Sequence, residues 1–145
     1  MPLDGTYEPS TWDLVANQVS QYEASGGQQG GTLEGKPCVI LWTRGRRSGS
    51  IRKSALMRVE HEGTYAVVAS MGGAPMHPQW YLNLVADPEV TLQDGAEVFD
   101  FQARTATPQE KAQWWPRATE VWPPYDDYQR NTDRDIPLVL LEKRN

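Results

Sequence analysis

Residues 37–69 read PCVILWTRGRRSGSIRKSALMRVEHEGTYAVVA and contain three strand-like runs with no helix between them. The run 39–43 is apolar, and the run 54–60 alternates between apolar and charged residues. The run 65–69 is apolar on both faces, which predicts a strand at the centre of a sheet. Strands that follow one another through turns pair antiparallel. This stretch therefore predicts the start of an antiparallel sheet.

Helices and further strands are expected in the rest of the chain. The helices, identified by capping or stop signals, are one from the cap residues Ser10 and Asp13 to about Ala24, one over 78–86, one from Thr107 to about Val121 and one over 125–131. The strands are one near 90–92 before an Asp94-Gly95 turn, one over 98–103 and one over 136–141. The elements predict an α+β fold, a small antiparallel barrel of about six strands with inserted helices and an N-terminal helix.

The chain divides into two parts by composition. Residues 1–35 hold the N-terminal helix and a Gly-rich arm (26–35), which we expect to be flexible or to form the hinge of a lid. Residues 36–145 hold the barrel, the domain expected to carry the binding site.

The totals exclude several classes of protein. The 145 residues carry a net charge of −5, which argues against nucleic-acid binding. The single cysteine, Cys38, indicates a reducing, cytoplasmic location, and its apolar neighbours predict an inert core thiol. No apolar run approaches the ~20 residues of a membrane span, and no secretory signal is visible. With Cys38, His61 and His77 far apart, no metal site is expected.

The stretch Arg44–Arg58 is a positive patch on an anionic chain. It holds 6 of the 14 Lys and Arg residues and no acid. Glycines and serines between the cations supply turn conformations and free backbone N–H groups, a combination that cradles anions. The alternative is a solvated hairpin tip, as for an ordinary charged turn.

Aromatic residues are concentrated in the second half of the chain: Trp80, Tyr81, Trp114, Trp115, Trp122, Tyr125 and Tyr128. Each Trp alone is better explained by a core than by a site, because large aromatic residues dominate cores. Tyr125 and Tyr128 differ because they lie in a polar segment. An anion-binding loop and an aromatic wall together suit a flat, phosphorylated cofactor in a dry pocket.

Three motifs carry a family resemblance. They are Thr43-x-Gly45-Arg46-Arg47-Ser48-Gly49 with Arg52-Lys53-x-x-Leu56, then Ala69-Ser70-x-Gly72-Gly73-Ala74-x-x-x-Pro78-x-Trp80-Tyr81-Leu82-Asn83-Leu84, then Pro124-Tyr125-x-x-Tyr128-Gln129-x-x-Thr132-Asp133-Arg134-x-Ile136-Pro137. In these motifs, from about Gly31 onward, the chain resembles the deazaflavin-dependent nitroreductases of actinobacteria, which include F-420H2-dependent quinone and enone reductases.

The resemblance implies a split β-barrel, related to FMN-binding proteins, that binds coenzyme F-420. This cofactor is an 8-hydroxy-5-deazaflavin with a phosphodiester and an oligoglutamate tail. The implied reaction transfers a hydride from F-420H2 to an electron-poor small molecule such as a quinone, an activated enone or a nitroaromatic. A quinone acceptor would bring a peripheral contact with the inner face of the membrane. The oligomeric state stays open.

The resemblance also implies roles for individual residues. Those for the phosphate and tail are Arg46, Arg47, Ser48, Arg52 and Lys53; those around the ring are Ser54, Ala55, Leu56, Met57, Val68, Ala69, Ser70, Met71 and Tyr125; those closing the site are Gln79, Trp80, Tyr81, Leu82 and Asn83. Tyr125, Tyr128 and Ser70 are the expected catalytic residues, facing the substrate.

Two positions depart from the family pattern. Ala55 stands where a proline is common, and Met57 stands where the best-known nitroreductase has a tyrosine. Both bear on prodrug activation rather than on cofactor binding. The alternative functions are an FMN-dependent oxidoreductase on the same barrel and a non-enzymatic F-420-binding protein.

Overall fold

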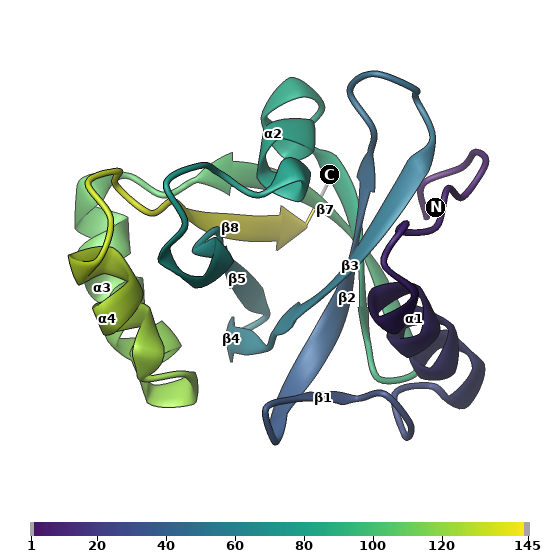
Figure 1. Cartoon of the computed structure of the whole chain (residues 1–145), viewed down its shortest axis with the longest axis horizontal. Coiled ribbons are helices and arrows are strands. Elements are labelled where there is room, and N and C mark those ends of the chain that lie inside the picture. Colours follow the sequence, from purple (N-terminus) through teal and green to yellow (C-terminus); the bar gives the residue numbers. More distant parts are fainter. Residues whose placement is uncertain (1, 144–145) are drawn as a thin grey trace.

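The computed structural model describes residues 2–143 (Figure 1). Its helices are α1 (Asp13–Ser25), the 3-10 turn η1 (Met71–Gly73), α2 (Gln79–Ala86), α3 (Pro108–Val121) and α4 (Pro124–Arg130). Its strands are β1 (Thr32–Leu33), β2 (Lys36–Arg44), β3 (Ile51–Met57), β4 (Val59–His61), β5 (Thr64–Val68), β6 (Glu89–Asp94), β7 (Glu97–Thr105) and β8 (Leu138–Lys143). Within these residues no helix is long and apolar enough to cross a membrane.

The strands form one curled antiparallel sheet in the order β1-β2-β6-β7-β8-β5-β4, with β3 also paired to β2. β3, which pairs with β2, and β4, at the far end of this order, are consecutive in the chain, so the chain itself links the two ends of the curled sheet. The extended strand is interrupted at Arg58, between β3 and β4, and the backbone N–H of Arg58 donates to the Pro37 carbonyl at 3.1 Å. The sheet is the antiparallel split barrel expected from the sequence, of α+β class.

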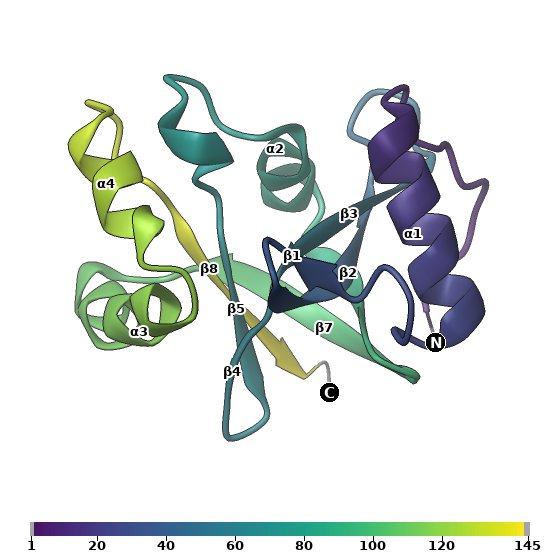
Figure 2. The same cartoon turned by 60° about the horizontal axis from the view of Figure 1, so that its bottom comes forward.

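The continuous apolar character of β2 and β5 follows from burial on both faces. In β2, Val39 and Leu41 belong to the barrel core, whereas Cys38 and Ile40 belong to a second core beneath α1. In β5, Val67 belongs to the barrel core, and its neighbours Ala66 and Val68 pack with the helices α3 and α4. Figure 2 shows the result: α1 lies on one side of the curled sheet, α3 and α4 lie on the other, and α2 lies between.

Three predicted boundaries were wrong. The expected strand over 54–60 is two strands, because the break at Arg58 redirects the chain from β2 to β5. The sheet has eight strands instead of about six, one of them (β1) within the Gly-rich arm. The N-cap of α1 is Trp12, which has no side-chain cap, and Ser10 Oγ accepts a hydrogen bond from the Trp12 N–H at 3.1 Å. The capping box of α3, formed by Thr107 and Glu110, is confirmed.

The N-terminal part of the chain is held on the barrel by backbone and side-chain bonds. The Thr6 carbonyl accepts from Ile51 N–H at 2.7 Å, and Glu8 N–H donates to the Ile51 carbonyl at 2.9 Å. The hydroxyl of the buried Tyr22 on α1 accepts from the Gly95 N–H at 2.7 Å and donates to the Cys38 carbonyl at 3.1 Å. The edge of β3 is thereby covered, and α1 is fixed over β2.

The loop 69–74, which contains η1, touches α4 closely. Gly73 adopts a left-handed conformation (φ +83°), and a Cβ atom there would lie 3.0 Å from the Tyr128 carbonyl oxygen and 3.1 Å from its Cα. Gly72 is also left-handed (φ +65°), but a Cβ there would meet nothing within 4 Å. Of these two glycines, Gly73 alone combines the left-handed conformation with a lack of space for a side chain.

We predict that Gly73→Ala destabilises the protein more than Gly72→Ala. Both changes strain the left-handed backbone, but only the first forces η1 away from α4, and overpacking of this kind costs about 1–3 kcal/mol. Urea unfolding of the two variants measures the difference. Equal losses of unfolding free energy in the two variants would show that η1 and α4 can move apart without destabilising the protein.

Candidate functional site

Two adjoining cavities lie between the hairpin β2–β3, the helices α1 and α2, and the aromatic residues near α4. One is polar, with a volume of about 350 Å³, and the other is mainly apolar, with a volume of about 500 Å³. Val15, Ser54 and Trp80 line both cavities, so the two form one continuous candidate site.

The polar cavity contains most of the basic stretch that the sequence singled out. Its lining residues are Glu8, Ser10, Val15, Gly45, Arg46, Arg47, Ser48, Arg52, Lys53, Ser54, Gln79, Trp80 and Asn83. The turn is shaped by its own backbone, since Gly45 N–H donates to the Ser50 carbonyl at 2.7 Å and Gly49 N–H to the Gly45 carbonyl at 2.8 Å. Gly49 takes φ +75°, which favours glycine there.

Arg46 is fixed against α2 by two neutral amides. Its Nη1 donates to Asn83 Oδ1 at 2.9 Å and its Nη2 to Gln79 Oε1 at 2.8 Å. The buried Asn83 is held in turn, because its Nδ2 donates to Thr43 Oγ1 at 3.3 Å. Amide oxygens orient a guanidinium without neutralising it, so Arg46 keeps its full charge beside the cavity.

Arg52 already has an anionic partner within the site. Its Nη1 lies 2.8 Å from Glu8 Oε2, and the Ser48 hydroxyl donates to Glu8 Oε1 at 3.4 Å. Arg47 is exposed and, among residues 2–143, forms no ion pair. Of the predicted anion-binding cations, Arg46 and Arg47 are therefore the two whose charge no carboxylate of the described chain neutralises.

Lys53 lies differently from the other cations. Although Lys53 lines the polar cavity, its Nζ lies 2.5 Å from Glu23 Oε2 on α1 and 4.1 Å from the centre of the Trp42 ring. The Tyr7 ring covers the same ammonium at 4.5 Å, and only 10% of the Lys53 side chain is exposed. Burial, and then the charge of Glu23, raises the pKa of Tyr7. The charge of Lys53 thus holds α1 and the N-terminal segment on β3.

The apolar cavity is walled by β3, the loop after β5, α1 and the aromatic residues of the C-terminal half. Its lining residues are Trp12, Val15, Gln18, Leu33, Glu34, Ser54, Ala55, Leu56, Met57, Val68, Ser70, Met71, Gly72, Pro78, Trp80, Trp122, Tyr125 and Tyr128. A flat, apolar ring system fits such walls better than a sugar or a peptide does.

Four residues that line this apolar cavity carry hydroxyl groups: Ser54, Ser70, Tyr125 and Tyr128. Ser70 and Tyr125 are 7% and 5% exposed, and within residues 2–143 neither hydroxyl has a hydrogen-bond partner. Burial, and then the neighbouring Tyr128, raises the pKa of Tyr125, so its phenol stays protonated. Tyr128 Oη accepts from Trp122 Nε1 at 3.2 Å, which leaves its own O–H free to donate. The cavity therefore offers several donors and no basic side chain.

Three of the predicted site residues line neither cavity. Ala69 is fully buried in the barrel core. The Tyr81 hydroxyl pairs with Thr105 Oγ1 at 3.1 Å, and its ring lies 4.9 Å from that of His77. Leu82 lies on α2 outside both linings. The remaining predicted residues are brought together in the two cavities.

Sequence reasoning did not find the contribution of the N-terminal part. Glu8, Trp12, Val15 and Gln18 line the cavities, as do Leu33 and Glu34 of the arm. A signal existed, because Trp12, Val15, Val19 and Tyr22 share one helix face. In the structure the residues of this face have two roles. Val19 and Tyr22 belong to the core beneath α1, whereas Trp12 and Val15 line the apolar cavity.

The residues of the site fit a cofactor with a flat ring and an anionic tail. Cations and turn amides lie in the polar cavity, and the apolar cavity begins where they end. Within residues 2–143 no group of three or more His, Cys, Asp or Glu could hold a metal ion.

Comparison with known proteins identifies the family of the chain. Residues 14–143 match the family model described as F420H(2)-dependent quinone reductase. The F420H(2)-dependent quinone reductase Rv1261c of Mycobacterium tuberculosis is 33% identical over 127 residues, which cover 85% of each chain.

Solved structures give the same result. The F420-H2 dependent reductase FDR-A is 48% identical, with a TM-score of 0.70 over 73% of this chain and 94% of that one. A solved domain-swapped dimer is 43% identical, with a TM-score of 0.72 over 92% of this chain and 100% of its own. The chain belongs to the F420H(2)-dependent quinone reductase family.

Proposed function

We propose that this protein is an F-420H2-dependent reductase that passes a hydride to an electron-poor acceptor, with quinones and activated enones as the preferred class. The observation that carries the proposal is the junction of the two cavities: cations free of carboxylate partners on one side, and an apolar chamber with phenol and hydroxyl donors on the other. Family membership supports the same cofactor.

In this proposal the polar cavity holds the anionic part of the cofactor. Arg46, Arg47 and Ser48 bind the phosphodiester and the glutamate tail through charge-assisted hydrogen bonds. Arg52 is paired with Glu8 through Nη1, and its remaining N–H groups donate to the same anion, because its side chain is 34% exposed. Lys53 contributes positive potential rather than a direct bond, because its ammonium is already paired with Glu23. When bound, the deazaflavin supplies the hydride, so the protein itself needs no redox group.

The apolar cavity orients the acceptor and manages its charge. A quinone or enone that gains a hydride develops negative charge on oxygen, which a hydrogen-bond donor stabilises as it forms. Among the residues that line this cavity, Tyr125, Tyr128 and Ser70 are the donors that we assign to this role. The apolar walls exclude water and thereby strengthen these bonds. Of the two tyrosines, Tyr128 has its hydroxyl oriented by a neighbour, because Trp122 Nε1 donates to Tyr128 Oη.

The proposal includes a cytoplasmic location and, for a lipid-dissolved quinone, a peripheral contact with the inner membrane face. The start of α1 supports this contact. Trp12 is 69% exposed at the apolar cavity, and the nearby Leu14 is 73% exposed. Aromatic and aliphatic side chains of this kind insert at the boundary of headgroups and acyl chains.

The first prediction concerns the choice of cofactor. F-420 should bind more tightly than FMN, and its affinity should fall as salt rises, because its tail is matched to Arg46 and Arg47 and exposed charges are screened. Fluorescence titration of both cofactors at two salt concentrations measures this. Tighter binding of FMN would replace the proposal with an FMN-dependent oxidoreductase. Tight F-420 binding without oxidation of F-420H2 by any quinone of a panel would identify the protein as a non-enzymatic F-420-binding protein.

Arg47→Gln and Arg130→Gln form a matched pair for the same titration. Arg47 lines the polar cavity, whereas Arg130 pairs with Asp127 on the surface of α4. Loss of a charge-assisted bond costs roughly 1.5–3 kcal/mol, so Arg47→Gln should weaken F-420 binding about ten- to a hundredfold. Arg130→Gln should leave it unchanged. Equal affinities of the two variants for F-420 would show that the basic loop is a solvated turn that does not bind the cofactor.

The second prediction concerns the donors. Tyr128→Phe should lower turnover by on the order of a hundredfold while F-420 affinity and melting temperature stay the same, because the ring remains and only the hydroxyl is lost. Tyr125→Phe and Ser70→Ala test the other two donors in the same assay. Turnover that survives all three changes would assign the proton to solvent. A fall in melting temperature would assign the hydroxyl a packing role instead.

The third prediction concerns the membrane contact. The double variant Trp12→Ser, Leu14→Ser should sediment less with lipid vesicles than the unmodified protein, because it loses the exposed apolar anchor. Val98→Ser is the matched control, since Val98 is also exposed but lies on β7. Identical sedimentation of all three proteins would remove α1 from the proposed contact.

A further inference from the structure

We propose that Arg134 is the positioning residue of the substrate cavity: with Gln129 it clamps the loop bearing Ser70 to the helix bearing Tyr125 and Tyr128. Arg134 belongs to the motif that carries Tyr125 and Tyr128, but the function above gives it no role, and it lines neither cavity. The inference rests on the proposed function for its effect on turnover, but not for the clamp itself.

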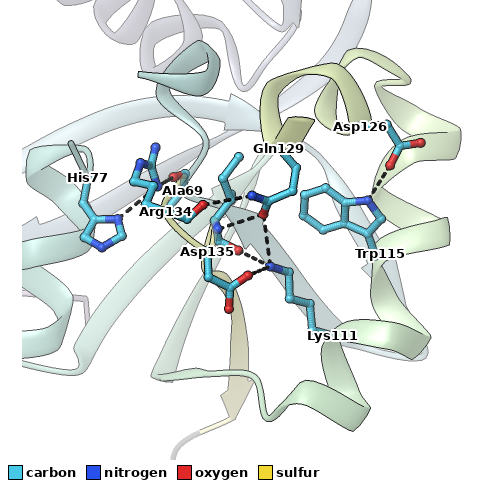
Figure 3. A network of polar contacts seen from close by, with 9 residues as sticks. Ala69, His77, Lys111, Trp115, Asp126, Gln129, Arg134 and Asp135 are labelled. Atoms are coloured by element: carbon cyan, nitrogen blue, oxygen red, sulfur yellow. Dashed lines mark hydrogen bonds and ion pairs between the residues drawn. The ribbon is translucent and has the colours of Figure 1, made fainter. Parts of the chain in front are cut away.

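The guanidinium of Arg134 makes four contacts to residues 69–77. Figure 3 shows the contacts with Ala69 and His77. Its Nε donates to the Ala74 carbonyl at 2.8 Å, its Nη1 to the Ala69 carbonyl at 3.0 Å, and its Nη2 to the Ser70 carbonyl at 2.6 Å. Nη1 also lies 3.0 Å from His77 Nδ1. Since arginine cannot accept, Nδ1 is the acceptor, and the neutral His77 carries its proton on Nε2.

The backbone of residues 69–77 contains an unfavourable conformation that needs support from outside. Met71, Gly72 and Gly73 take φ values of +48°, +65° and +83°, three left-handed residues in succession. A non-glycine residue such as Met71 adopts this conformation only where its surroundings impose it. The three carbonyls bound by Arg134 lie just before and just after these residues. Ser70, Met71 and Gly72 line the apolar cavity, so the shape of that wall depends on this support.

The other half of the clamp ties Arg134 to α4 and α3. Gln129 Nε2 donates to the Arg134 carbonyl at 2.9 Å, and Gln129 Oε1 accepts from the Ile136 N–H at 2.9 Å. Lys111 of α3 adds a bond to the Ile136 carbonyl at 2.6 Å and an ion pair with Asp135 at 2.7 Å. Figure 3 shows these side chains converging from α3 and α4 on the segment 134–136.

Arg134 has no ordinary ion-pair role. Among residues 2–143 no carboxylate lies within ion-pair distance of it, and the side chain is half-buried. Its guanidinium instead donates hydrogen bonds to three carbonyl oxygens that lie in different directions. The planar fork of an arginine can reach all three, whereas the single ammonium of a lysine cannot. The relative position of the Ser70 donor and the tyrosine donors therefore depends on Arg134, a side chain behind the cavity wall, together with Gln129.

Arg134→Ala tests the clamp, with Arg134→Lys as the conservative variant and Arg130→Ala as the matched control on the surface of α4. The first measurement is hydrogen exchange of the unliganded protein. The Gly73 and Ala74 amides, bonded to the Ser70 and Met71 carbonyls, should exchange at least tenfold faster in Arg134→Ala. The β6–β7 hairpin should not change. Millimolar guanidinium chloride, far below denaturing concentrations, should restore the slow exchange, and ammonium chloride should not.

The second measurement uses the proposed reaction. Arg134→Ala should lower kcat on a quinone at least tenfold while F-420 affinity, set in the polar cavity, changes less than threefold. Arg134→Lys should recover only part of the loss. Unchanged exchange over 69–77, or rescue by ammonium as well as guanidinium, would overturn the clamp. If Arg134→Ala does not fold, exchange in Arg134→Lys decides. Fast exchange in a protein that shows no F-420H2 oxidation would keep the clamp and refute the proposed function.

Discussion

The pairing of β2 with β3, seven residue pairs from Cys38–Met57 to Arg44–Ile51, is the constraint on which the rest of the structure depends. Its turn and the start of β3 carry the cations of the polar cavity, and the rest of β3 carries side chains that line the apolar cavity. At Arg58 the same strand leaves β2 and pairs next with β5, which closes the barrel. One hairpin thus builds the site and joins the two ends of the sheet.

Much of the fold could be predicted because period-two alternation and turn residues are local signals. The runs 39–43 and 65–69, the Asp94-Gly95 turn and the capping box at Thr107 all mark elements that the structure contains. The break at Arg58 could not be predicted, because it depends on the Pro37 carbonyl, which lies far away in the sequence. Pairing of the N-terminal segment with Ile51 is equally non-local.

The site divides in the same way. Arg46, Arg47, Tyr125 and Tyr128 could be named from motifs, since residue type alone suggests their chemistry. The role of Lys53 could not be predicted from the sequence, because its partner Glu23 and the Trp42 and Tyr7 rings come from three other segments. Arg134 gives no sequence signal of its role either: its partners are backbone carbonyls, which every residue possesses.

The position of Cys38 has a consequence for the chemistry proposed here. Quinones and enones are Michael acceptors that alkylate thiolates, and a reductase that binds them risks inactivating itself. Cys38, the only cysteine of the chain, is 3% exposed, and burial raises the pKa of its thiol to about 11. The reactive thiolate is therefore scarce at neutral pH and shielded from the cavity's contents. The protein confronts electrophiles while presenting almost no nucleophilic sulfur for them to modify.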